Sequence, residues 1–86
     1  MKFEYQTSPE VCSQSVLVEI GDDGRIVSAR FRGGCPGSLL AVGNLVSGMT
    51  PEQAIAALDG TRCGGKRTSC PDQLAQALKA YLAKRG

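Results

Sequence analysis

The residues of this sequence best suited to chemistry are its four cysteines, Cys12, Cys35, Cys63 and Cys70. Thiolates bind Zn²⁺ and iron–sulfur clusters, and they are also the nucleophiles of thiol–disulfide exchange. The chain contains no histidine, so it offers zinc no imidazole ligand and cannot form a cysteine–histidine or serine–histidine catalytic pair. Its chemistry is therefore expected to rest on sulfur.

Two of the cysteines stand immediately before a proline, in the similar runs Cys35-Pro36-Gly37-Ser38-Leu39 and Cys70-Pro71-Asp72-Gln73-Leu74. Proline favours the first position of a helix, so both cysteines are predicted to lie at or near a helix N-terminus. The free N–H groups and partial positive charge of a helix N-terminus favour the thiolate over the thiol. A thiolate is the form that a metal ligand or a redox nucleophile requires.

All four cysteines are predicted to lie in loops or at the ends of elements. Cys63 precedes Gly64 in a loop shortly before Cys70, and Cys12 precedes the central predicted strand. Free cysteine is often buried as a small apolar residue, so packing is the alternative interpretation. Placement outside strands and helices favours a shared functional site, because functional residues concentrate in loops. In a secreted domain the same even number would indicate two disulfides.

Several kinds of sulfur chemistry are compatible with this set. Four thiolates suit Zn²⁺ or, as an alternative cofactor, an iron–sulfur cluster, and zinc is the preferred prediction. No Cys-x-x-Cys pair is present, so spacing alone does not select a metal site. A second hypothesis is a redox relay in which Cys63 and Cys70 form a disulfide and pass electrons to a reductase. A third is iron–sulfur scaffolding or transfer.

Length and composition limit the classes of function. The 86 residues, of mass 9.0 kDa, form one domain spanning residues 1–86. No apolar run approaches the ~20 residues that cross a bilayer, and residues 1–9 are polar without the apolar core of a secretory signal. We therefore expect a cytoplasmic protein with reduced thiols and no membrane contact. A net charge of only +2 gives no reason to predict nucleic-acid binding.

The loop from Arg62 to Arg67 carries a small basic cluster that includes Lys66. The cluster is expected either to be a solvated loop or to offset the negative charge of a thiolate site. Because the loop precedes a predicted helix N-terminus, it is also a candidate site for a nucleotide phosphate.

The first half of the chain has the alternation of strands. Residues 2–6, 15–20 and 25–32 are predicted strands, and the Asp-Gly turn at 21–24 predicts a hairpin between the last two. In the third strand the simple alternation places Val27, Ala29 and Phe31 on the apolar face and Ile26 on the polar and basic face.

The second half has helical spacing. Apolar residues recur from Leu39 to Gly48, a capping box at 50–53 begins a short helix that ends at 59–60, and Pro71 opens a last helix. Strands followed by helices predict an α+β fold, with a three-stranded antiparallel sheet followed by three helices packed on one face.

The run Thr68-Ser69-Cys70-Pro71-Asp72-Gln73-Leu74 resembles the signature of the TSCPD domain family, and Gly33–Gly37, Leu45–Gly48 and Cys63-Gly64 match that family in order. The resemblance covers Tyr5 to Leu82. It implies a link to deoxyribonucleotide synthesis, because the domain forms the C-terminal part of adenosylcobalamin-dependent ribonucleotide reductases and also exists as small free-standing proteins. A ribonucleotide reductase or another redox protein is the expected partner. The chain lacks the reductase's radical-generating barrel, so no complete catalytic machinery is expected.

A more distant similarity connects the order of elements with the NifU/IscU-type iron–sulfur scaffolds. It implies that Cys12, Cys35 and Cys70 match the three scaffold ligands for Zn²⁺ or a [2Fe–2S] cluster, with Cys63 as a fourth ligand. The sequence has Gln14 and Ser69 where scaffolds carry an assisting Asp and a His. A closed site of four thiolates is expected to be structural or electron-transferring rather than cluster-donating.

Overall fold

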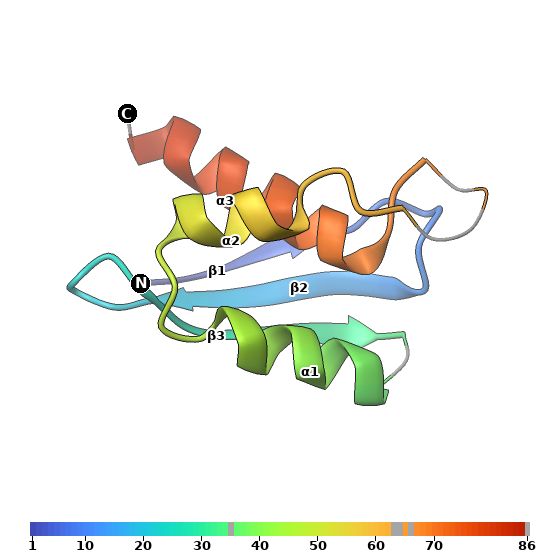
Figure 1. The fold of residues 1–86 in the computed structure, drawn as a ribbon, viewed down its shortest axis with the longest axis horizontal. Coiled ribbons are helices and arrows are strands. Elements are labelled where there is room, and N and C mark those ends of the chain that lie inside the picture. The colour runs from blue at the N-terminus through green and yellow to red at the C-terminus, as the bar shows by residue number, and fades with distance from the viewer. Residues whose placement is uncertain (35, 63–64, 66, 86) are drawn as a thin grey trace.

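Three antiparallel strands precede three helices in the computed structural model, which describes residues 1–34, 36–62, 65 and 67–85 (Figure 1). The sheet has the order β1-β2-β3, with strands β1 (Lys2–Gln6), β2 (Ser13–Ile20) and β3 (Ile26–Gly33). The helices are α1 (Pro36–Val46), α2 (Pro51–Leu58) and α3 (Cys70–Arg85). This arrangement confirms the predicted α+β class and the order of its elements.

The predicted hairpin joins β2 to β3. The Gly21 N–H donates to the Arg25 carbonyl oxygen at 2.9 Å, and the Gly24 N–H donates to the Gly21 carbonyl oxygen at 2.9 Å. Gly24 has a φ of 82°, a left-handed conformation that residues with a Cβ adopt at a cost. The Asp-Gly pair therefore forms the predicted turn, because its glycine adopts the left-handed conformation that the turn requires.

A bulge near this turn reverses the predicted facing of two residues. Ile20 pairs with Ile26 whereas Glu19 pairs with Ser28, so Val27 is an extra residue in β3. An extra residue shifts the alternation of side chains by one position. As a result Ile26 is 1% exposed and Val27 is 52% exposed. The sequence-based assignment of Val27 to the apolar face and Ile26 to the polar face was therefore wrong.

The core lies between the sheet and the helices, chiefly α3. Leu74 and Leu78 of α3 are fully buried in one cluster with Val16 and Val18 of β2. At the other end of α3, the ring of Tyr81 stacks on Phe3 of β1 with ring centroids 5.4 Å apart. The core thus draws on residues of β1, β2 and α3.

Helix α2 begins at the predicted capping box. The Thr50 hydroxyl accepts from the Gln53 N–H at 3.2 Å, and the Gln53 side chain accepts from the Thr50 N–H at 3.0 Å. The buried residues of α2 are Pro51 and Ala54, and the helix packs chiefly against α3.

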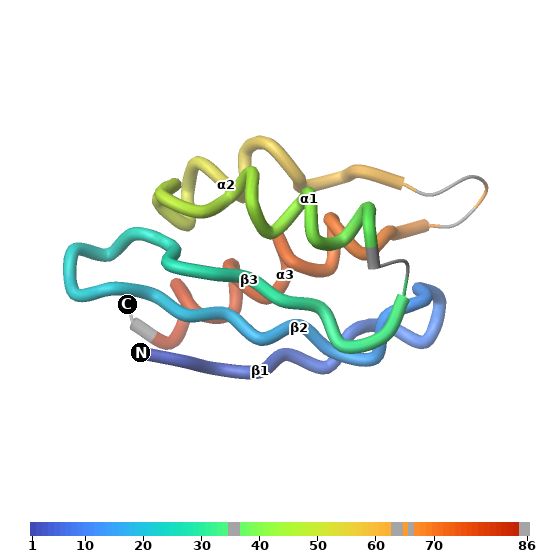
Figure 2. The backbone as a smooth tube through the Cα atoms, turned by 90° about the horizontal axis from the view of Figure 1, so that it is seen from below, coloured from blue at the N-terminus to red at the C-terminus, as the bar shows by residue number. Residues whose placement is uncertain are grey.

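Helix α1 lies alongside β3, and both views of the chain show this neighbour relation (Figures 1 and 2). The two elements approach closely because Gly43 has no side chain. A Cβ built on Gly43 would collide with the carbonyl oxygen of Ala29. Farther along α1, the Ser47 hydroxyl donates to the Val27 carbonyl oxygen at 3.3 Å. None of the described helices has the length and apolar character needed to cross a membrane.

Replacing Gly43 with alanine is expected to destabilise the fold by about 1–3 kcal/mol, because the added methyl group must push α1 away from the β3 backbone. Gly37→Ala is the matched control in the same helix, since a Cβ there meets nothing within 4 Å. That control should leave stability unchanged or raise it slightly, because alanine favours helices. Urea unfolding of both variants measures the difference, and equal midpoints would contradict this packing.

Candidate functional site

Ser69 caps the N-terminus of α3. Its hydroxyl accepts from the Asp72 N–H at 3.2 Å, and its carbonyl oxygen accepts from the Gln73 N–H at 2.8 Å. Cys70 is consequently the first residue of α3, as its position before Pro71 predicts. The thiol therefore lies at the positive end of α3, the longest of the described helices.

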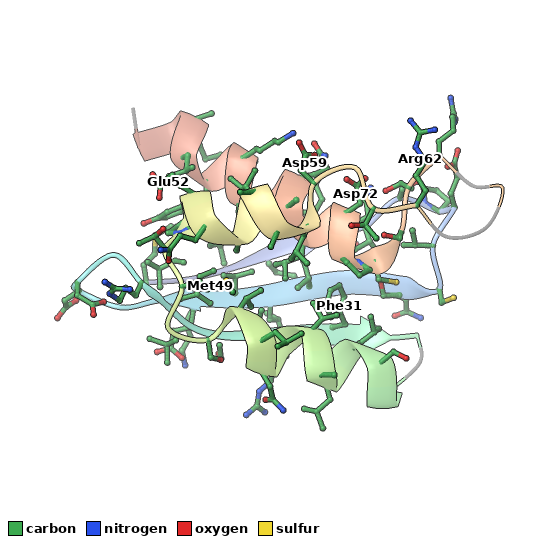
Figure 3. All side chains as sticks on the ribbon, viewed as in Figure 1. Phe31, Met49, Glu52, Asp59, Arg62 and Asp72 are labelled. Carbon is green, nitrogen blue, oxygen red and sulfur yellow. The ribbon has the colours of Figure 1, made fainter. Side chains whose placement is uncertain are left out.

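Asp72 holds the segment between α2 and α3 against the start of α3. Its carboxylate accepts from the Gly60 N–H at 2.8 Å and from the Thr68 hydroxyl at 2.5 Å. Figure 3 shows Asp72 beside this connection, close to Asp59 at the end of α2. Burial opposes ionisation of Asp72 and is the largest single influence. Hydrogen bonds from Thr68, Gly60 and Gln76, together with the charge of Lys79, outweigh it and lower the pKa of the carboxyl.

Gln73 extends the same network to the β1–β2 connection. Its side-chain N–H donates to the Thr68 hydroxyl at 3.0 Å, and its side-chain oxygen accepts from the Ser8 N–H at 2.9 Å. Thr68, Ser69, Asp72 and Gln73 are all buried. The polar residues of the signature therefore fix α3 to the β1–β2 connection and to the α2–α3 connection. The sequence predicts the helix start at Cys70 and Pro71, but it does not reveal the buried network that the polar residues of the run form.

Cys70 contacts the start of β2. Its side chain is 9% exposed, and its sulfur lies 3.2 Å from the hydroxyl of Ser13. A second bulge sets this contact. Ser13 pairs with Gly33 and Ser15 pairs with Arg32, so Gln14 is an extra residue in β2. Ser13 and Ser15 consequently face different partners, and the Ser15 hydroxyl donates to Glu4 at 2.6 Å.

Ser13, the residue after Cys12, also lies against Gly34, the residue before Cys35. Cys12 is exposed and directly precedes Ser13 in the sequence. A Cβ built on Gly34 would lie 3.4 Å from the Ser13 nitrogen and 2.6 Å from Cδ1 of Leu39. This crowding and a φ of 84° explain why glycine occupies the position before Cys35.

The α2–α3 connection brings a further part of the chain to the same region. The Ser69 hydroxyl donates to the Thr61 carbonyl oxygen at 2.7 Å, and Thr61 precedes Cys63 by two positions. The predicted ligands Cys35 and Cys63 themselves lie outside the described residues.

The structure thus describes Cys12 and Cys70 of the four predicted ligands. Within residues 1–34, 36–62, 65 and 67–85, no three cysteine, aspartate or glutamate side chains are grouped as a metal site requires. The four-cysteine set remains a prediction, because two of its members fall in the gaps of that range.

The basic loop is partly engaged within the protein. Arg67 donates to the Glu10 carboxylate at 2.6 Å, which joins this loop to the β1–β2 connection. Arg62 is exposed and extends outward (Figure 3), whereas Lys66 lies outside the described residues. The Asp72 and Gln73 N–H groups at the start of α3 already have Ser69 as their partner. Phosphate binding at this loop remains a prediction.

We expect Thr68→Val to destabilise the protein by about 2–3 kcal/mol, because it removes a donor to Asp72 and an acceptor for Gln73 in a buried network. Thr61→Val provides the control, since the Thr61 side chain is exposed and its hydrogen bond to Ser69 uses only the backbone. Chemical denaturation compares the two variants. A loss as large in Thr61→Val as in Thr68→Val would argue against the network.

The lowered pKa of Asp72 predicts a pH dependence of stability. The folded state holds the carboxyl's proton less tightly than the unfolded state does. The ionised Asp72 therefore stabilises the fold at pH values above 3.8, the usual pKa of an aspartate. This contribution is lost as pH falls through the lower, folded-state pKa. The gap in unfolding free energy between wild type and Asp72→Asn should therefore narrow below about pH 4. A gap that is constant from pH 7 to pH 3 would contradict the assignment.

Comparison with known proteins places the chain in a family. The family model described as the TSCPD domain matches residues 2–82, nearly the whole chain. Searches among curated proteins and among solved structures gave no match. The structural roles of Thr68, Ser69, Cys70 and Asp72 thus fall on the signature from which the family takes its name. The chain belongs to the TSCPD domain family, which is associated with the C-terminal region of ribonucleotide reductases.

Proposed function

We propose that this TSCPD domain binds one Zn²⁺ ion through Cys12, Cys35, Cys63 and Cys70 and acts as an accessory to a ribonucleotide reductase. The observation that carries the proposal is the contact of 3.2 Å between the Ser13 hydroxyl and the Cys70 sulfur. It joins the start of β2, next to Cys12, to the start of α3.

The neighbouring contacts support a common position for all four sulfur atoms. Gly34 packs against Ser13, and Cys35 follows Gly34 directly in the sequence. Thr61 is bonded to Ser69, and Cys63 follows Thr61 by two positions. Consecutive Cα atoms are about 3.8 Å apart. Each of the four cysteines is therefore within two residues of the joined segments.

The chemistry of the donor set fits zinc. Four thiolates carry two more negative charges than Zn²⁺ neutralises, so a tetrathiolate site needs positive potential or hydrogen-bond donors around it. The N-terminus of α3 supplies positive potential at Cys70. When bound, zinc would supply a tetrahedral cross-link without redox chemistry. The protein's own contribution is to present sulfur from a strand end and a helix start at one place.

A cross-link at this position fits the size of the domain. Small domains bury too little apolar surface for a large margin of stability and often use a metal. The hydrophobic cluster of the described residues draws on the sheet and on all three helices, whereas Cys70 lies at the start of α3, beside the polar network. Zinc binding would therefore add a cross-link between the start of β2 and the start of α3 to the stability that the apolar core supplies.

Anaerobic purification followed by elemental analysis and thiol counting tests this function. We expect one zinc per chain and four thiols that react with a disulfide reagent only after chelation. Iron with a brown colour would favour the iron–sulfur alternative. A metal-free protein that stays folded in a chelator would contradict metal binding, and a reversible disulfide in that protein would favour the redox relay.

Cys12→Ser separates ligation from packing. Because Cys12 is exposed, loss of its sulfur removes little core contact and by itself should leave stability within about 0.5 kcal/mol. If Cys12 is a ligand, the variant should lose most of its bound zinc and melt at a lower temperature, by about 4–8 °C for each kcal/mol lost.

In the presence of a chelator, wild type and Cys12→Ser should melt at the same temperature. Equal melting temperatures and equal zinc content without chelator would exclude Cys12 as a ligand.

A further inference from the structure

We infer that Ser13 is a positioning residue for the proposed zinc site, whose hydroxyl donates a hydrogen bond to the sulfur of Cys70 and tightens metal binding. The inference rests on the proposed function and adds a residue outside the four-cysteine set. Its starting point is a buried hydroxyl whose partner is a sulfur atom.

The direction of this hydrogen bond follows from metal binding. In the thiol form either the Ser13 oxygen or the Cys70 sulfur is able to donate across the 3.2 Å contact. A cysteine that binds a metal has lost its proton. The sulfur is then only an acceptor, so the hydroxyl of Ser13 becomes the donor. Because Ser13 is 4% exposed, water has little access to compete for that hydroxyl.

The backbone of Ser13 is held from several sides, which makes the donor geometrically defined. The Thr7 hydroxyl donates to the Ser13 carbonyl oxygen at 2.7 Å. Gly33 pairs with Ser13 across the strands, and Gly34 packs against its nitrogen and Cα. A donor that is already in place gives up little conformational freedom when the thiolate forms.

The bulge at Gln14 explains why Ser13, rather than a neighbour, has this position. In a regular strand, Ser13 and Ser15 would lie on the same face. The bulge separates them, so that Ser13 meets Cys70 while Ser15 meets Glu4. Bulges often redirect a side chain next to a functional site.

A hydrogen bond to a metal-bound thiolate draws off part of its negative charge. Partners of this kind change metal affinity by about 10- to 100-fold when removed. The Ser13 hydroxyl would act together with the helix N-terminus at Cys70, and both reduce the excess negative charge of four thiolates. Ser13 touches the ligand and not the metal, so its effect is on affinity and electronic structure.

The test compares Ser13→Ala with Ser15→Ala in the full chain loaded with Co²⁺ and Zn²⁺. Both serines are buried in β2, at 4% and 1% exposure, but of the two only Ser13 is hydrogen-bonded to a described cysteine. Ser13→Ala should bind Zn²⁺ about 10- to 100-fold more weakly in a competition assay. Its sulfur-to-cobalt charge-transfer band should move to longer wavelength, because a thiolate without its hydrogen bond donates electrons more readily. Ser15→Ala should retain the wild-type affinity and band position.

A folded Ser13→Ala protein with wild-type affinity and spectrum would overturn the inference and leave the proposed zinc site intact. Wild type that takes up neither metal would overturn both. If Ser13→Ala does not fold, wild type loaded with ¹¹³Cd decides. A through-bond coupling between cadmium and the Ser13 hydroxyl proton supports the inference, and an observed hydroxyl proton without that coupling overturns it.

Discussion

The contact between Ser13 and Cys70 joins two residues that are far apart in the chain, one at the start of β2 and the other at the start of α3. Its length of 3.2 Å depends on two further features, a bulge in β2 and the Ser69 cap that starts α3 at Cys70. The bulge turns Ser13 toward α3, and the cap fixes where the helix begins. Without either feature the sulfur and the hydroxyl would not meet.

The signature of the family has two physical roles in this structure. Thr68, Ser69, Asp72 and Gln73 form a buried network with every described buried side-chain polar atom bonded, and such networks define a single arrangement when fully satisfied. Cys70 lies in the same run of the chain, and its sulfur contacts Ser13. The polar residues thus fix the position of α3, and Cys70 is the residue of the run whose side chain could bind a metal. This division explains how one short run positions both a helix and a candidate ligand.

Local features of the fold were predictable from the sequence, and nonlocal ones were not. The Thr50 capping box and the turn at Gly24 each depend on residues within a few positions, so the local sequence was sufficient to predict them. The facing of Ile26 and Val27 was missed because the bulge arises from pairing with β2, which no local alternation reveals. For the candidate site, the place of Cys70 at a helix start was predictable from Pro71. Its contact with Ser13, 57 positions away, was not, because it requires the register of the sheet and the docking of α3 together.

The proposed function requires that four sulfur atoms surround one zinc ion. X-ray absorption at the zinc edge of the protein purified without added metal tests this most directly, because it identifies the ligand atoms themselves. We expect a single shell of four sulfur atoms at about 2.3 Å. A first shell that contains nitrogen or oxygen, or a folded protein with no zinc to measure, would contradict it.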